Sequence, residues 1–378
     1  MDTTPPVADA IAWRRHLHAN PELSFHEYET SQFVHETLAS FGGLVLERPT
    51  PTSVVARLHG DNPGRTLALR ADMDALPINE ESGVEFASRT EGVMHACGHD
   101  GHTAALLAVA RTLVDRRAEL AGEVRFLFQH AEELPPGGAT ELVAAGVLDG
   151  VDAVIGAHLM STLEVGKIGV LDGPCTAAAD TFSATITGRG GHGAFPHETV
   201  DPVAIAAQAI TNLQHIVSRN TPPLDNVVVS VTQISGGTAD NIIPEAVEFG
   251  GTVRTYRREL REQTRDAIER ILSGIASAHN ASYQLHYTVG YDPVVNDPVI
   301  AALVRDAAGA DRLVDFEPLM AGEDFSAYLR AAPGCFFFVG AGHDGAFPHH
   351  HPRFTIDERA LPVAIETLTR AALRFLNA

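Results

Sequence analysis

The sequence is poor in cysteine and has no long hydrophobic run. Its 378 residues include only three cysteines, Cys97, Cys175 and Cys335. They are too few and too scattered for a disulfide framework and suit a reducing compartment, so we expect a cytoplasmic protein. The longest purely apolar run, residues 104–110, is too short to cross a bilayer, and the first residues lack the basic and apolar segments of an export signal. We therefore expect neither export nor membrane anchoring.

Basic charge is also scarce. The chain carries 27 Lys and Arg against 48 Asp and Glu, which gives a formal net charge of -21. A surface with this excess of negative charge repels phosphate backbones and anionic lipid headgroups, so we expect neither nucleic acid nor membrane partners. Hydrophobic residues make up 45% and charged residues 20%, close to the averages for globular proteins, which argues against disorder. The length predicts two domains, or one large domain with an insertion.

The first part of the chain alternates between predicted helices and strands. Apolar spacing predicts a helix over residues 8–19, and Ser24 to Glu27 has the capping-box pattern before a second helix that ends near residue 41. Strand-like runs follow, with a helix over residues 103–114 after the second of them. These runs cover residues 53–58, 66–70, 124–128 and 151–157. The alternation predicts a mixed, mostly parallel sheet covered by helices on both faces.

The pattern changes near residue 176. From there to residue 289 the predicted order is β-α-β-β-α-β, the ferredoxin-like unit. Alternation then returns, with a helix over residues 298–308, a Phe-rich strand over 335–339 and a closing helix over 361–375. We therefore predict an α/β protein whose catalytic domain comprises residues 1–175 and 290–378. Residues 176–289 form an inserted ferredoxin-like domain in this prediction.

Ionisable side chains gather where the predicted strands end. In open α/β sheets ligands bind beyond the carboxyl ends of the strands, so these groups are expected to share one crevice. Each group alone has an ordinary explanation, such as a buried thiol, a solvated acidic pair or a surface histidine tract. Their coincidence at several strand ends favours one transition-metal site, because thiolate, imidazole and carboxylate are its ligands. The groups are Asp72 with Asp74, His95 to His102, Glu132 with Glu133, His158, and His349 to His351.

Competing signatures fail on their context. Residues 188–193 and 340–345 both match G-x-G-x-x-G, but neither match opens a predicted helix, which argues against dinucleotide binding. The sequence contains no Walker A motif, no G-x-S-x-G elbow and no H-E-x-x-H helix. A serine hydrolase or a zincin is therefore disfavoured.

Taken together, the motifs resemble the aminoacylase, hippurate hydrolase and indole-acetyl-amino-acid hydrolase branch of the metal-dependent amidohydrolases, relatives of the co-catalytic zinc carboxypeptidases. The likeness spans almost the whole chain. It is carried by RRHLH (14–18), LRADMDALPI (69–78), MHACGHDGHT (94–103), residues 128–133 and 188–197, DNIIPE (240–245), GTVRT (251–255) and AGEDFS (321–326). The resemblance implies two divalent ions, which the sequence does not identify among Zn, Mn, Co and Ni. It implies Cys97, His99, Glu133, His158 and His350 as their ligands.

The resemblance also implies catalytic roles. Glu132 is the implied general base, which deprotonates a metal-bound water that attacks an amide carbonyl. Asp74 is expected behind the metal cluster, orienting an imidazole. Spacing alone does not decide which of Glu132 and Glu133 coordinates. His349 and His351 remain alternatives to His350.

The inserted domain adds three candidates. In relatives, the histidine corresponding to His192 reaches the substrate carbonyl, often in a neighbouring subunit, so action within its own chain or across subunits stays open. Asn241 is a further substrate-binding candidate, and Arg254 is a candidate clamp for a substrate carboxylate, because guanidinium binds carboxylates bidentately. The open sheet edges predict a homodimer through residues 176–289, which would act as lid and dimerisation domain.

The leading functional hypothesis is hydrolysis of the amide bond of an N-acyl amino acid. A carboxypeptidase or dipeptidase using the same site is an alternative. A non-catalytic metal or small-ligand binding protein is another, and the presence of both Glu132 and Glu133 argues against it, because a binding module needs no base.

Overall fold

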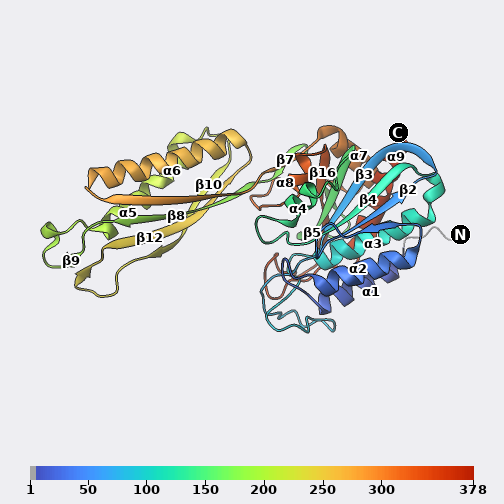
Figure 1. Ribbon diagram of the computed structural model, residues 1–378, viewed down its shortest axis with the longest axis horizontal. Helices are drawn as coiled ribbons and strands as arrows, with labels where there is room; N and C mark the ends of the chain where they lie inside the picture. Colours follow the sequence, from blue (N-terminus) through green and yellow to red (C-terminus); the bar gives the residue numbers. More distant parts are fainter. Residues whose placement is uncertain (1–5) are drawn as a thin grey trace. The chain divides into compact units, whose positions relative to one another are not determined.

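A computed structural model describes residues 6–378, and the chain divides into two compact units (Figure 1). The first unit comprises Met1–Cys175, Val294–Pro318 and Asp324–Ala378. The second comprises Thr176–Pro293 together with Leu319–Glu323. The second unit thus begins at the predicted residue, extends past residue 289 to Pro293, and includes a short segment from the later part of the chain.

An eight-stranded sheet forms the centre of the first unit, in the order β1-β2-β4-β3-β5-β16-β6-β15. Its central strands β4, β3, β5 and β16 pair in parallel, whereas β1 with β2, β2 with β4, and β6 with β16 pair antiparallel. The predicted mixed, mostly parallel sheet is confirmed. The strands are β1 (Val45–Glu47), β2 (Val54–His59), β3 (Asn62–Asp72), β4 (Ala121–Gln129), β5 (Ala153–Glu164), β6 (Ile168–Gly169), β15 (Leu313–Val314) and β16 (Gly334–Gly342), and outside the sheet β7 (Gly173–Thr176) pairs with β14 (Val294–Asn296).

Helices cover both faces of this sheet. On one face α3 and α9 pack against each other and against β3, where Leu67 and Leu69 join the apolar core. Strand alternation turns Arg70 to the opposite face, where it meets Asp324 near the short helices α4 and α8. The helices are α1 (Val7–Ala19), α2 (Tyr28–Phe41), α3 (His99–Asp115), α4 (Gly138–Ala144), α7 (Pro298–Ala308), α8 (Ser326–Leu329) and α9 (Ala360–Leu376). Within residues 6–378 we find no helix whose length and apolar character would let it cross a membrane.

Two local predictions were wrong. Helix α3 begins at His99 rather than at residue 103, so the polar residues of the histidine cluster occupy its first turn. The Ser24 to Glu27 capping box does not form, because α2 begins at Tyr28 and its N-cap residue is Glu27, three residues after Ser24. Instead the Glu22 carboxylate accepts the N–H groups of Glu29 and Thr30, at 3.2 and 2.8 Å. Ser24 and Glu27 are thereby left for contacts elsewhere.

The second unit is a four-stranded antiparallel sheet in the order β10-β12-β8-β13, with α5 and α6 packed on one face (Figure 1). This is the predicted β-α-β-β-α-β arrangement. A separate two-stranded ribbon pairs β9 with β11. The elements are β8 (Ala178–Thr187), β9 (Gly191–His192), α5 (Pro202–His215), β10 (Val227–Ser235), β11 (Ile242–Ile243), β12 (Ala246–Thr255), α6 (Arg258–Ala278) and β13 (Ser282–Tyr291).

Candidate metal centre and active site

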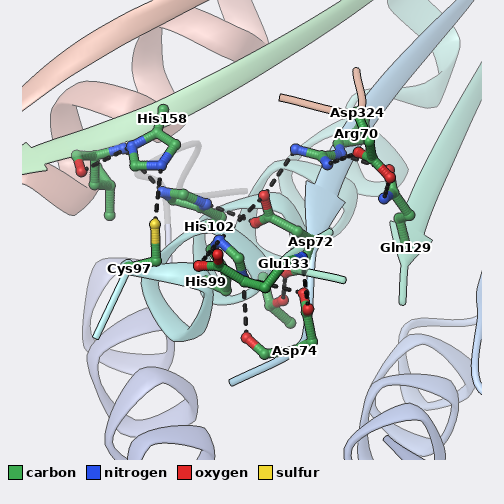
Figure 2. Close-up of polar contacts among 12 residues, drawn as sticks. Arg70, Asp72, Asp74, Cys97, His99, His102, Gln129, Glu133, His158 and Asp324 are labelled. Atoms are coloured by element: carbon green, nitrogen blue, oxygen red, sulfur yellow. Dashed lines mark hydrogen bonds and ion pairs between the residues drawn. The ribbon is translucent and has the colours of Figure 1, made fainter. Parts of the chain in front are cut away.

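A tight turn before α3 brings two candidate ligands to the end of β5. Gly98 stands between Cys97 and His99 with a φ of +98°, a left-handed conformation that glycine adopts without steric cost. On one side of this turn the Sγ of Cys97 lies 3.4 Å from Nε2 of His158, a residue of β5 (Figure 2). The turn therefore places the thiol and both imidazoles within one small region.

All five candidate ligands gather in overlapping groups whose ligand atoms lie within 4.8 Å of one another. One group is Cys97, His99 and His158, and a second is Cys97, Glu133 and His350. Both contain Cys97, which is the arrangement expected of a thiolate shared between two ions. A third group joins His99 to Glu132 and Glu133, so the candidate base lies beside the candidate ligands.

Two unsatisfied buried atoms test whether a cation fits here. Among the described residues, Nε2 of His99 and Oε1 of Glu133 are buried without a well-directed hydrogen bond, and they lie 4.0 Å apart. Buried polar atoms are normally paired, so two such atoms facing each other call for an explanation. An ion between an imidazole nitrogen, a carboxylate oxygen and the nearby thiolate supplies it. The residues therefore fit divalent transition-metal ions.

The electrostatics of the cluster favour positive charge. Hydrogen bonds with Cys97 and Glu133 raise the pKa of His350 to about 10. Burial opposes the charged form of His99, but the charges of Asp72 and Cys97 outweigh it and raise the pKa of this imidazole well above its usual value. His158 differs, because burial and the neighbouring His102 lower its pKa and keep its ring neutral. The acidic groups and the thiol around His99 and His350 thus favour positive charge at these two rings.

Asp74 holds two of the candidate ligands. Its Oδ1 lies 3.2 Å from Nδ1 of His99, and its Oδ2 accepts the N–H of Glu133 at 3.0 Å (Figure 2). The same Oδ2 accepts the hydroxyl of Ser24 at 2.6 Å. Burial alone would raise the pKa of Asp74, but its bonds to His99 and Ser24 lower it. An ionised Asp74 therefore holds the His99 ring and the backbone of Glu133 in place.

A buried polar network that the sequence analysis did not assign continues from this cluster. Asp72 accepts from Nδ1 of His102 at 2.6 Å and from Arg70 at 2.7 Å, and Arg70 also donates to Asp324 at 2.8 Å (Figure 2). Nε2 of His102 accepts the N–H of Leu159 at 2.9 Å. Asp72 and His102 thus fix the backbone next to His158. The sequence features that could have indicated this network are the Asp-x-Asp spacing, which includes Asp72, and His102, the third histidine of HACGHDGH.

The three consecutive histidines point in different directions. His350 joins Cys97 and Glu133, with its backbone at a φ of +65°. Nε2 of His349 accepts the N–H of Ser161 at 3.4 Å, and Nδ1 of His351 accepts the N–H of Arg353 at 3.0 Å. His350 is therefore the member that we retain as a proposed ligand.

The other three candidates lie in the second unit. His192 on β9 pairs with Ile242 on β11, and the N–H of Gly193 donates to the carbonyl of Asn241 at 2.8 Å, so His192 and Asn241 lie side by side. Both side chains are exposed. Arg254 lies on β12 and donates to the carbonyls of Asp180 and Val253, at 3.3 and 3.2 Å.

Comparison with known proteins assigns the family. Residues 68–374 match the model of peptidase family M20/M25/M40. The chain belongs to this family. It is 62% identical over 288 residues to an N-acyl-L-amino acid amidohydrolase of Geobacillus stearothermophilus, with 76% of this chain and 78% of the relative covered. It is 44% identical to an N-acetyl-L-cysteine deacetylase of Bacillus subtilis, over 97% of this chain and 88% of that protein.

A solved structure extends the likeness to the fold. A dinuclear metal-binding M20 peptidase from Bacillus subtilis superposes with a TM-score of 0.87 at 38% identity, covering 98% of each chain. The two ions in that description agree with the two ligand groups that share Cys97. The predicted family resemblance and the expectation of a metal-dependent amide hydrolase are confirmed for this M20 enzyme.

Proposed function

We propose that this M20 enzyme removes the acyl group from N-acyl amino acids by hydrolysing their amide bond. The observation that carries the proposal is the group of five candidate ligands with Glu132 beside them. The relatives named as an N-acyl-L-amino acid amidohydrolase and an N-acetyl-L-cysteine deacetylase support the same substrate class.

In this proposal two divalent ions are held by Cys97, His99, Glu133, His158 and His350. When bound, such ions polarise a carbonyl and lower the pKa of water. Glu132 is buried, with 6% of its surface exposed, and follows β4 directly before a ligand. It takes a proton from the attacking water and delivers it to the leaving nitrogen. Asp74 keeps His99 and Glu133 in place through its hydrogen bonds to both residues.

The second unit supplies substrate contacts in this proposal. His192 donates a hydrogen bond to the carbonyl oxygen as negative charge develops on it. Asn241, held beside His192 by the β9–β11 ribbon, contacts the same end of the substrate. Arg254 binds the substrate carboxylate. The guanidinium N–H groups that donate to backbone carbonyls in this structure then donate to the substrate instead.

We also propose a cytoplasmic homodimer. Three scattered cysteines suit a reducing compartment, which supports the cytoplasm. In the second unit β10 and β13 are the edge strands of the sheet, and an exposed edge offers unpaired backbone groups to a second copy. The second unit then serves as lid and dimerisation domain.

A substrate panel tests the proposed activity. The apoprotein is reconstituted separately with Zn²⁺, Mn²⁺, Co²⁺ or Ni²⁺, and release of free amino acid is followed for N-acetyl and N-benzoyl amino acids and for unmodified dipeptides. We expect turnover of N-acyl amino acids. Turnover of dipeptides alone would assign a dipeptidase, and no turnover by a fully metallated protein would assign a binding role.

A further inference from the structure

The buried carboxylate of Glu27 reaches the segment that carries the acidic pair. Glu27 lies between α1 and α2 and is 0% exposed. Its Oε1 accepts the N–H of Ala131 at 2.8 Å and the N–H of Phe25 at 3.0 Å. Ala131 directly precedes Glu132 and Glu133. Glu27 therefore contacts the backbone of the site from a distant part of the sequence.

Both amides bound by Glu27 belong to residues with left-handed backbones. The φ angles are +67° at Phe25 and +48° at Ala131. Residues other than glycine reach this region at a cost in free energy, so the surroundings must hold them there. One carboxylate oxygen holds two such residues at once. Without this oxygen we expect the backbone of Ala131 to relax to a negative φ. That change would turn the side chains of Glu132 and Glu133 away from the metal centre.

The same segment also holds the other side of the acidic pair. Ser24 donates its hydroxyl to Asp74, and Asp74 accepts the N–H of Glu133. The backbone is thus fixed at Ala131 by Glu27 and at Glu133 by Asp74, with Glu132 between these two anchors. Both anchors depend on residues 24–27.

We propose that Glu27 is a positioning residue that fixes the turn at Ala131 and thereby directs Glu132 and Glu133 into the metal centre. This inference rests on the proposed function. What the turn requires from Glu27 is an acceptor oxygen at the Oε1 position.

The surroundings of Glu27 indicate that its charge is not required. Burial and the nearby charge of Asp74 raise the pKa of Glu27 to about 7. Protonated or ionised, the side chain keeps an acceptor for both amides. Its Oε2 makes no well-directed hydrogen bond within residues 6–378, and the nearby Thr52 hydroxyl can accept from the amide nitrogen of a glutamine. We therefore expect glutamine at position 27 to hold the turn at Ala131 as glutamate does. We expect aspartate, whose carboxylate is one methylene shorter, to fail to hold it.

Three substitutions separate acceptor position from charge. Glu27→Gln keeps the oxygen and removes the charge, Glu27→Asp keeps the charge and withdraws the oxygen, and Glu27→Ala removes both. Glu22→Ala is the matched control, because the Glu22 carboxylate also accepts two backbone N–H groups, and both belong to the start of α2. Each variant is measured for kcat and KM, metal content, thermal unfolding, and the visible spectrum of its Co²⁺-substituted form.

We expect Glu27→Asp and Glu27→Ala to lower kcat by about tenfold or more, the usual effect of losing a group that orients ligands. KM changes less than kcat, and the Co²⁺ spectrum shifts because Glu133 moves. Glu27→Gln keeps the wild-type spectrum and a kcat within about threefold of wild type. Glu22→Ala lowers the unfolding temperature without altering the spectrum or kcat.

Two results would overturn the proposal. One is a wild-type kcat and Co²⁺ spectrum in Glu27→Asp, and the other is a Glu27→Gln variant that folds but is as impaired as Glu27→Asp. If Glu27→Ala does not fold, the comparison of Gln with Asp still decides. The spectrum needs no substrate, so it tests Glu27 even if the wild-type enzyme proves inactive on N-acyl amino acids and the proposed function fails.

Discussion

The Nε2 atom of His350 lies 3.2 Å from Oε1 of Glu133. The N–H of His350 donates to the carbonyl of Ala96 at 2.8 Å, which ties the loop after β16 to the residue before Cys97. One ligand group therefore draws on three distant parts of the chain, and Cys97 belongs to the second group as well.

This sharing predicts unequal losses of metal. His158→Ala or His350→Ala removes a ligand from one group, so we expect each variant to retain about one ion per subunit of the proposed two. Cys97→Ser weakens both groups, because a serine hydroxyl is a poor ligand, and is expected to retain less than one. Elemental analysis after dialysis against a weak chelator measures the difference. Equal metal content in Cys97→Ser and wild type would show that Cys97 is an ordinary buried thiol and not a metal ligand.

The base assignment predicts a different outcome for the two adjacent glutamates. Glu132→Gln removes a proton acceptor, so kcat is expected to fall roughly 10²- to 10⁴-fold while metal content stays unchanged. Glu133→Gln is the matched control and is expected to lose metal. Steady-state kinetics and elemental analysis on the same samples check both. A Glu132→Gln enzyme with more than about half the wild-type kcat would show that another group is the base.

Sequence reasoning pointed to the candidate site through the ends of strands, because the position of Glu132, Glu133 and His158 relative to buried strands is a local pattern. It misread Ser24 and Glu27 for the same reason. Their spacing is that of a capping box, and only the folded chain shows that Ser24 reaches Asp74 and Glu27 reaches the distant Ala131. Contacts between segments far apart in the sequence produce no local pattern of residue types, so sequence reasoning does not detect them.

The histidine triplet shows a second limit. Three neighbouring imidazoles have the same chemistry, and the choice among them depends on backbone angles. The left-handed conformation of His350 turns its ring toward Cys97 and Glu133. Nothing in the residue types of His349 to His351 predicts which of them adopts it.

His18 predicts how stability depends on pH. Its Nδ1 lies 2.9 Å from Asp100, and its Nε2 lies 3.1 Å from Glu80. Burial would lower the pKa of His18, but the charge of Asp100 and the hydrogen bonds with Asp100 and Glu80 outweigh it and raise the pKa to about 9. Because the folded pKa exceeds the unfolded value of ~6.5, the protonated form stabilises the fold fully below pH ~6.5. This stabilisation, about 3 kcal/mol, is lost as the pH rises to 9.

Urea unfolding of the metal-free protein between pH 6 and 9 measures this effect. His18→Asn is expected to unfold at lower urea than wild type at pH 6, with the difference shrinking toward pH 9. His215→Asn, which changes an exposed histidine of α5, is the control and is expected to follow wild type throughout. A difference between His18→Asn and wild type that does not vary with pH would rule out the ion pair as its source.

The edge strands of the second unit lead to a prediction about assembly. We expect a homodimer by analytical ultracentrifugation, formed through the second unit with two-fold symmetry. If His192 serves the partner's site, inactive His192→Ala subunits mixed with inactive Glu132→Gln subunits form heterodimers with one site that has both native residues. Random exchange of equal amounts then restores about a quarter of wild-type activity, since half the dimers are mixed and each has one working site. A mixture that stays inactive, although native mass spectrometry shows that the subunits have exchanged, would mean that His192 does not act across the dimer.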